Sequence, residues 1–538
     1  MTKQKLAWKG FAVILVILPL LYGGLKNDTK NSIDSDYGAL VALFEEFRAF
    51  MKPTVTDGIP DYTAEAMQRQ HRELKDLQRR LSAIDISRWP VSEQIGYHIV
   101  RAEMNGLEFN HRVLRPWARD PGFYCTIPRF EETMEGAVRI PRRLPIPEDR
   151  LQAFRAGLKA LPRILAQAKD NLTEVPSDLA LLALKMKKRE HDMFTELAGR
   201  LKENHPDLIP EVEGVIAAID DFQGWLEDNR GRMAAPAGVG IENYNWYLKN
   251  VYLFPYTWEE CRAIVQRELE RSHAYLRMEE HNNRNTPEFK PVTTEEDFNR
   301  LHIQAQEYLL DFLRKEQLFT VPDDMQTKPP PGYRRPDGFR NFFEECLDRD
   351  PLPLIAHDIV GHTPDARRQA QDDRPIRGVG RPYHIAGIRA EALATGIEEL
   401  LTHAGLLDER RRSRELMYIL VAFRASRAAA DLLMHSNELS FEEALRYTAE
   451  MTPRGYAKAD SFLVWDDLEL YIRQPGYGMG YLMGKVQLDK LLADYSRLQG
   501  KEFSLKRFFD DFFAAGMAPV SLIRWEMTGQ EDEIRKLW

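Results

Sequence analysis

The chain has 538 residues, 43% of them hydrophobic, and a formal net charge of −9 at pH 7. This length and apolar content are enough for a large core and for more than one domain. The acidic balance argues against a nucleic-acid-binding surface, because the basic residues form only short runs such as Arg410 to Arg412. The three cysteines are odd in number and lack C-x-x-C spacing, which argues against a disulfide framework and a cysteine-based zinc cluster.

The first residues have the features of a membrane-targeting segment. Three lysines precede an apolar run from Phe11 to Leu25, and neither an A-x-A-like cleavage site nor a lipoprotein cysteine follows it. This combination predicts an uncleaved signal-anchor over residues 1–30, with a cleaved signal peptide as the alternative. Because positive residues stay on the cytoplasmic side, we expect the protein to be membrane-anchored and to face the periplasm or the extracellular side.

From Asp36 onward the sequence is typical of consecutive α-helices. Thr257 and Glu260 form a predicted capping box ahead of a helical apolar stripe, and Ser440 and Glu443 repeat the pattern. Alternating strand patterns flanked by turn signals are nearly absent from the sequence. We therefore expect a mostly α, multi-helical fold.

Proline and glycine cluster in two places, residues 234–240 and 326–338. The first cluster is the predicted boundary between an N-terminal helical lobe, residues 31–240, and a metal-binding catalytic helical lobe, residues 241–538. The second is a predicted surface loop that leads into the active region.

The hexapeptide HDIVGH places His357 and His362 five residues apart. In a regular helix, residues four apart are offset by about 40° and residues five apart by about 140°. The two rings therefore converge only if the helix takes up an extra residue in a π-type bulge or ends there, and Gly361 suits either outcome. Two histidines can then bind a metal while the adjacent acid, Asp358, activates its water. The alternative is a histidine at an ordinary helix C-terminus.

The third metal ligand is sought downstream, in IRAEALATGIEELL. Glu391 and Glu398 are seven residues apart and so lie on one helical face, among alanine, leucine and isoleucine. Acids on an apolar face are costly unless they are paired or bind a metal. We expect Glu391 to be the ligand, with Glu398 as the second candidate. A salt-bridged pair that uses Arg389 or Arg427 is the alternative.

Further site candidates follow along the chain. Arg427, Asp431 and His435 are spaced i, i+4 and i+8, so they form a line on one helix. In a catalytic site His435 would donate to a developing oxyanion while Asp431 and Arg427 orient it, and surface ion pairing is the alternative. Tyr481 follows the sequence GYGMG, whose glycines allow a loop to carry the phenol toward a metal-bound carbonyl. The alternative is a flexible turn with a core tyrosine.

These blocks together resemble the bacterial domain-of-unknown-function 885 family, whose members show H-E-x-x-P-G-H and later E-G-W-A-x-Y-x-E. HDIVGH stands at the first motif, and EALATGIEEL lays Glu391 and Glu398 on the two acids of the second. The sequence RASRAAADLLMH is similar to the family's R-x-x-x-D-x-x-x-H segment, and QPGYGMGYLMGK resembles P-G-x-x-x-x-Y-x-x-G. The resemblance covers roughly residues 40 to 530.

The resemblance implies a gluzincin-like metallopeptidase fold with two lobes around a central cleft. It also implies a Zn²⁺-dependent hydrolase that cleaves short peptides with a metal-activated water. The expected partners are thus a small peptide substrate and, through the N-terminal segment, a membrane; no nucleic acid is expected.

The motif also departs from the family, because Asp358 replaces the glutamate and one residue is missing before Gly361. The resulting H-D-x-x-G-H has the histidine spacing of dipeptidyl peptidase III and matches the iron motif of bacterial aromatic amino acid hydroxylases. Two histidines and one carboxylate also suit non-haem Fe²⁺. The alternatives are therefore an iron oxygenase on the same triad and a catalytically impaired, peptide-binding pseudoenzyme, since the shorter Asp358 has less reach.

Overall fold

The computed structural model describes residues 36–129, 134–322, 325–335 and 338–538. Helices dominate this part of the chain, and its strands are the short antiparallel pair β1 (Val55–Thr56) and β2 (Ile59–Pro60). The predicted mostly α fold is confirmed. Within these ranges, no helix has the length and apolar character needed to span a bilayer. The predicted anchor over residues 1–30 lies outside the described residues.

The N-terminal helices α1 to α3 pack into the same large core as the C-terminal half of the chain. Helix α3 contacts α8 and α20, which are distant in sequence. The elements of this part are α1 (Asp36–Phe50), α2 (Ala64–Ser82), α3 (Val91–Phe109), the π-helix η1 (Asn110–Leu114), α4 (Pro116–Arg119), the 3-10 helix η2 (Pro121–Tyr124) and α8 (Ile241–Asn250).

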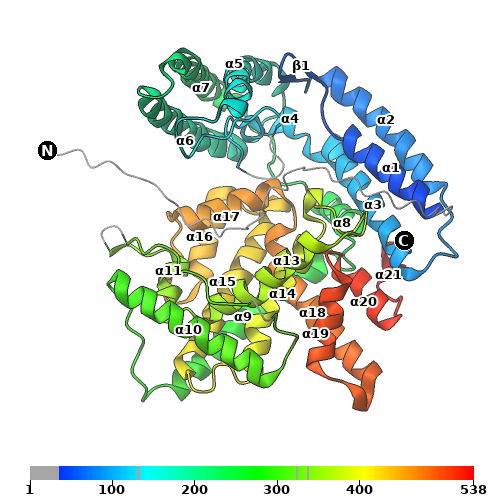
Figure 1. Ribbon diagram of the computed structural model, residues 1–538, viewed down its shortest axis with the longest axis vertical. Coiled ribbons are helices and arrows are strands. Elements are labelled where there is room, and N and C mark those ends of the chain that lie inside the picture. The colour runs from blue at the N-terminus through cyan, green and yellow to red at the C-terminus, as the bar shows by residue number, and fades with distance from the viewer. Residues whose placement is uncertain (1–35, 130–133, 323–324, 336–337) are drawn as a thin grey trace.

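Helices α5 (Glu148–Asn171), α6 (Ser177–Leu201) and α7 (Ile209–Asn229) form a bundle at the top of Figure 1. The short 3-10 helices η3 (Pro206–Leu208) and η4 (Arg230–Arg232) flank α7. This bundle has an apolar cluster of its own, separate from the large core. The division into lobes at residue 240 and the central cleft stay predictions.

Four helices lie at the centre of the C-terminal part of the chain: α9 (Trp258–Asn282), α14 (Gly387–His403), α15 (Arg411–His435) and α18 (Tyr477–Gln499). Helix α14 lies against α18, and α15 lies against both α9 and α18. Gly484 of α18 permits this close approach, because a Cβ there would lie 2.7 Å from the Ala392 Cβ of α14. Nearly the whole of α14 is therefore buried.

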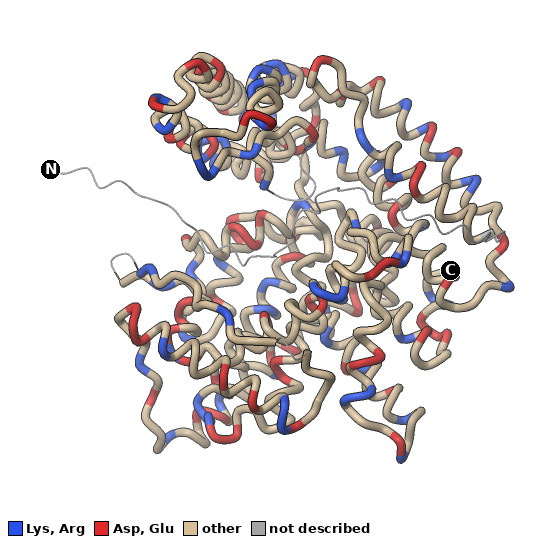
Figure 2. The backbone as a smooth tube through the Cα atoms, viewed as in Figure 1, with Lys and Arg blue, Asp and Glu red and all other residues tan. Residues whose placement is uncertain are grey.

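The remaining helices surround this centre. They are α10 (Glu295–Glu316), α11 (Phe342–Leu347), α12 (Leu352–Ala356), η6 (His357–His362), α13 (Thr363–Gln371), η7 (Pro382–His384), α16 (Phe441–Met451), η8 (Pro453–Gly455), α17 (Phe462–Arg473), η9 (Gly500–Glu502), α19 (Leu505–Ala515), α20 (Val520–Thr528) and α21 (Ile534–Leu537). Both predicted capping boxes are confirmed, at the starts of α9 and α16. Figure 2 shows basic and acidic residues interspersed along the described chain.

Candidate metal centre

The segment that carries the two histidines is a π-helix, η6, from His357 to His362, set between α12 and α13. In a π-helix the hydrogen bonds join residues five apart, so side chains at that spacing lie one above the other. The predicted bulge is therefore confirmed. Gly361 presses this turn against α14, because a Cβ at Gly361 would lie 2.4 Å from the Ala394 Cα.

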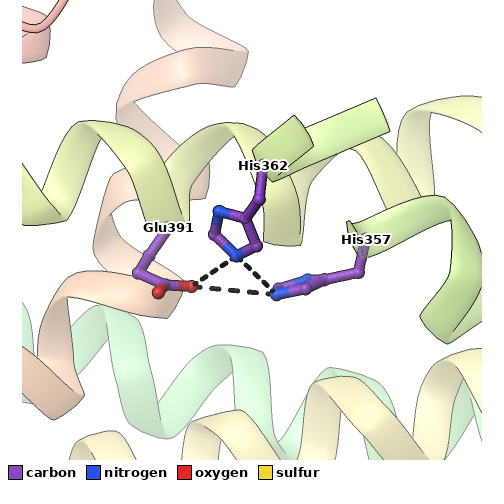
Figure 3. A group of neighbouring side chains, drawn as sticks. All are labelled: His357, His362 and Glu391. Atoms are coloured by element: carbon purple, nitrogen blue, oxygen red, sulfur yellow. Dashed lines mark hydrogen bonds and ion pairs between the residues drawn. The ribbon is translucent and has the colours of Figure 1, made fainter. Parts of the chain in front are cut away.

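The structure brings His357, His362 and Glu391 together (Figure 3). The Nε2 atoms of the two histidines lie 3.2 Å apart, and each lies 3.8 Å from the Glu391 Oε2. The histidine side chains are 12% and 25% exposed, so the group is partly accessible to solvent.

The donor set fits a metal ion. The Glu391 Oε2 is buried and has no hydrogen-bond partner among the described residues, although a buried carboxylate oxygen without a partner is costly. Two atoms bound to one tetrahedral zinc at about 2.0–2.1 Å lie about 3.3 Å apart, which matches the two histidines. Glu391 needs to move by only about half an ångström to fit the same geometry. The two histidines and one carboxylate also suit Fe²⁺.

Glu398 is not part of the group that could share one ion, and its role as a ligand stays a prediction. Its Oε1 lies 2.9 Å from the Nδ1 of His357, on the opposite side of that ring from Nε2. Burial raises the pKa of Glu398 to about 7, against the lowering effect of Arg424. Burial and the nearby Arg424 and His362 lower the pKa of His357, so its ring is neutral, as a metal ligand must be.

Asp358 points to the surface. Its carboxylate is 55% exposed and lies 3.2 Å from the Lys328 Nζ, which also donates to the Thr363 Oγ1 at 2.6 Å. Asp358 is not part of the group that could share one ion. Its role as general base stays a prediction.

Tyr481 is close enough to the cluster to be influenced by the Glu391 charge, and Arg427 lies beside Tyr481. Burial raises the pKa of Tyr481, and the strongest charge acting on it is the Glu391 carboxylate. The Arg427 guanidinium lies 5.1 Å from the centre of the Tyr481 ring and forms an ion pair with Asp467. Tyr481 thus keeps its proton close to the candidate metal ligands.

His435 and Asp431 are not surface residues, and neither has an open face toward a substrate. His435 is fully buried, and its Nε2 lies 3.0 Å from the main-chain carbonyl of Tyr471. Asp431 accepts hydrogen bonds from the backbone N–H of Gly476 at 3.2 Å and of Met479 at 2.9 Å, at the start of α18. Burial raises its pKa to about 7. Both side chains are used inside the core, and the oxyanion role of His435 stays a prediction.

Sequence reasoning missed Arg424, Asp467 and Lys328. Arg424 stands in the apolar run ILVAFRASRAAAD. A guanidinium buried in such a run requires an acidic partner, so the sequence pattern could have indicated a buried ion pair at Arg424. Asp467 and Lys328 carry no comparable signal, because acids and lysines are common at their kind of position.

Two solved structures share this fold. A candidate lipoprotein of unknown function from Shewanella oneidensis aligns with a TM-score of 0.71 at 15% identity, over 93% of this chain and 100% of that chain. A candidate lipoprotein from Colwellia psychrerythraea aligns with a TM-score of 0.66 at 15% identity, over 92% of this chain and 99% of that chain. No curated protein matches the sequence.

One protein-family model matches residues 48–327 and 394–527, which is more than half of the chain. The gap between the two matched ranges contains all three members of the candidate metal-binding group, His357, His362 and Glu391. The motif that departs from the family thus lies where the family model does not align. The chain belongs to the family described as bacterial protein of unknown function, DUF885.

Proposed function

We propose that the protein is a metal-dependent hydrolase of the gluzincin-like kind, most simply a zinc peptidase that cleaves short peptides. The single observation that carries the proposal is the convergence of two histidine Nε2 atoms on the unpartnered Glu391 Oε2. Three protein ligands with a side open to solvent are the pattern of a catalytic zinc site.

A bound zinc ion would polarise the substrate carbonyl and lower the pKa of a water molecule. The Glu398 Oε1 lies 2.9 Å from the Nδ1 of His357, where it can accept a hydrogen bond and so orient that ring. Tyr481 retains its proton and can donate it to the oxygen of the substrate carbonyl. For Asp358 to take a proton from the attacking water, its carboxylate has to turn from Lys328 toward the cluster.

The surface position of Asp358 favours one second candidate. If no carboxylate acts as the base, the two histidines and Glu391 form the facial triad of a non-haem iron oxygenase. In that case Asp358 has only its contact with Lys328, which agrees with its exposure.

Metal analysis combined with activity assays tests the proposal. The full-length protein is purified, its zinc and iron contents are measured, and di- and tripeptides are offered with either metal. Zinc at about one per chain with peptide cleavage supports the hydrolase, whereas ferrous iron with substrate-dependent oxygen uptake supports the second candidate. Protein that binds neither metal contradicts both.

Substitutions of Asp358 test whether this residue is the general base. Asp358→Asn should reduce peptide turnover by about two to four orders of magnitude while leaving the metal bound, and Asp358→Glu should retain activity. Cleavage that is unchanged in Asp358→Asn would show that another group is the base.

We also propose that the N-terminal segment holds the protein in a membrane, with the remaining chain outside the cytoplasm. The lysines ahead of the apolar run support this topology, and so does the fold shared with two candidate lipoproteins. Protease added to cells with a permeabilised envelope should digest the residues beyond 35. Proteins of the cytoplasm should remain undigested in the same experiment. N-terminal sequencing that begins near Asn27 would show cleavage instead of anchoring.

A further inference from the structure

Arg424 on α15 lies behind the metal centre, on the side of His357 that faces away from the open cluster. We infer that Arg424 is a positioning residue that, through Glu398, fixes the ring of His357 so that its Nε2 lone pair faces the other two ligands. This inference rests on the proposed metal centre and names a residue that the predicted motif does not contain.

The contacts form an unbroken chain from Arg424 to the ligand. The Arg424 Nη1 donates to the Glu398 Oε2 at 2.8 Å, and its Nη2 donates to the Glu398 Oε1 at 2.6 Å. The two side chains are 3% and 1% exposed, so water does not compete for either bond. The same Glu398 Oε1 lies 2.9 Å from the His357 Nδ1. A two-pronged pair of this kind fixes the plane of the carboxylate as well as its position.

The direction of these hydrogen bonds decides which ring nitrogen of His357 carries the proton. A guanidinium can only donate, so both bonds from Arg424 leave Glu398 as an acceptor. The Glu398 Oε1 lies 2.9 Å from Nδ1, so we place the ring hydrogen on Nδ1, which leaves Nε2 without a hydrogen on the side of His362 and Glu391.

A competing arrangement is visible in the same contacts. The Arg424 Nη2 also lies 3.3 Å from the His357 Nδ1, and a bond donated there would place the ring hydrogen on Nε2, where it would block a metal. The carboxylate is the nearer of the two groups, at 2.9 Å, and we take it as the partner of Nδ1. Glu398 therefore has to stay between Arg424 and the ring.

Helix α14 offers a matched control one residue further along. Arg271 binds Glu399 with the same two-pronged geometry, at 2.8 and 3.1 Å, and Glu399 is nearly as buried as Glu398. Neither Arg271 nor Glu399 contacts a histidine of the cluster among the recorded contacts. A change at Arg271 removes a comparable ion pair without touching His357.

The experiment measures Zn²⁺ affinity by competition with a chelating dye, using the full-length protein and the metal alone. Arg424→Met should raise the dissociation constant about 10- to 100-fold, as expected when the partner that orients a histidine ligand is disturbed. Arg271→Met should stay within about twofold of the wild type, because it alters no contact of the cluster. Arg424→Lys should fall between them, because a lysine cannot span both carboxylate oxygens in the arginine geometry.

A second variant keeps the test decisive if Arg424→Met alone fails to fold. Replacing Glu398 and Arg424 together by methionine leaves no unpaired buried charge, and such replacements are often neutral for stability. The folded double variant should show the same 10- to 100-fold loss of zinc affinity. Wild-type affinity in any folded variant that lacks Arg424 would overturn the inference.

A spectroscopic measurement on the unmodified protein is independent of all variants. With ¹⁵N-labelled histidine and no added metal, the His357 Nδ1 should give the signal of a protonated nitrogen and Nε2 that of an unprotonated one. The opposite assignment would overturn the inference. If the wild type binds neither zinc nor iron, the proposed function fails, whereas this signal still decides the role of Arg424 in fixing the ring.

Discussion

Glu398 and Glu399 are neighbours on α14 and almost equally buried, yet their carboxyl groups differ sharply. Burial raises the pKa of Glu398 to about 7, although Arg424 opposes the change. Burial acts in the same direction on Glu399, but hydrogen bonds and charges from Arg271 and Lys485 outweigh it and lower the pKa to about 2. The side of α14 that holds Glu391 and Glu398 is called the histidine side. The side that holds Glu399 is called the ion-pair side.

The difference lies in the partners. Glu399 meets two cations, so its charge is compensated and its role is to tie α14 to α9 and α18. Glu398 meets one cation and one neutral imidazole, so it remains available to accept a hydrogen bond from His357. One helix thus carries the candidate site on one side and the ion pairs that tie the helix to its neighbours on the other.

The largest expected effect is on the histidine side. Glu391→Gln should weaken Zn²⁺ binding by more than about 100-fold, beyond the usual effect of an outer partner, because a direct ligand loses its charge. The unfolding free energy of the metal-free protein should not fall, since an unpartnered buried carboxylate oxygen is removed. Dye competition and urea unfolding measure the two quantities. Zinc binding at wild-type affinity would remove Glu391 from the site.

The ion-pair side should respond in the opposite way. Glu399→Gln should cost about 3 kcal/mol of unfolding free energy near neutral pH, because Arg271 and Lys485 lose a buried partner. Its zinc affinity should stay within about twofold of the wild type, because Glu399 contacts no ligand of the cluster.

The loss of unfolding free energy in Glu399→Gln should depend on pH. The pKa of Glu399 in the folded protein, about 2, lies below its ordinary value of 4.5, so its stabilisation is complete above pH 4.5 and is lost as the pH falls toward 2. The difference in unfolding free energy between wild type and Glu399→Gln should therefore shrink between pH 5 and 3. A difference that is constant over this range would mean that the ion pairs do not hold the charge of Glu399.

A smaller effect is expected where the π-helix meets α14. Gly361→Ala adds a Cβ that would lie 2.4 Å from the Ala394 Cα, so the two segments have to separate. We expect a loss of about 1–3 kcal/mol in unfolding free energy and a roughly tenfold weaker zinc affinity. Gly380→Ala is the control, because no atom lies within 4 Å of its added Cβ. Equal behaviour of the two variants would contradict the importance of this contact.

The smallest effect is expected at the surface. Lys328→Met removes an ion pair in which both side chains are about half exposed, at 47% and 55%. Such pairs contribute at most about 1 kcal/mol, and Lys328 has no recorded contact with a metal ligand. Unfolding and zinc titrations should both stay close to the wild type. A tenfold change in zinc affinity would show that Lys328 acts on the cluster.

The sequence predicts features that depend on near neighbours in the chain. The helix caps at Thr257 and Ser440 and the π turn between His357 and His362 follow from local spacing. The place of Glu391 in the candidate site was predicted because acids are rare on an apolar helix face. The same argument does not decide between Glu391 and Glu398, which lie about 10 Å apart along the helix, and only Glu391 joins the histidine group.

The misassignments arise where helix packing decides the environment. Asp431 and His435 have the spacing of an exposed ion pair, but α15 is buried on every side, so both residues serve the core. The position of Arg424 beside Glu398 depends on how α15 crosses α14, which no local pattern contains. The general character of the site was therefore predictable, whereas the partners of its residues were not.

The π turn has an evolutionary consequence. Deleting one residue between the histidines, such as Val360, leaves the sequence HDIGH, whose four-residue spacing aligns the two rings in an ordinary α turn. Two motifs that differ by a single codon could thus present a pair of imidazoles on one face, one through an α turn and one through a π turn. Searches that fix the histidines four residues apart pass over this sequence.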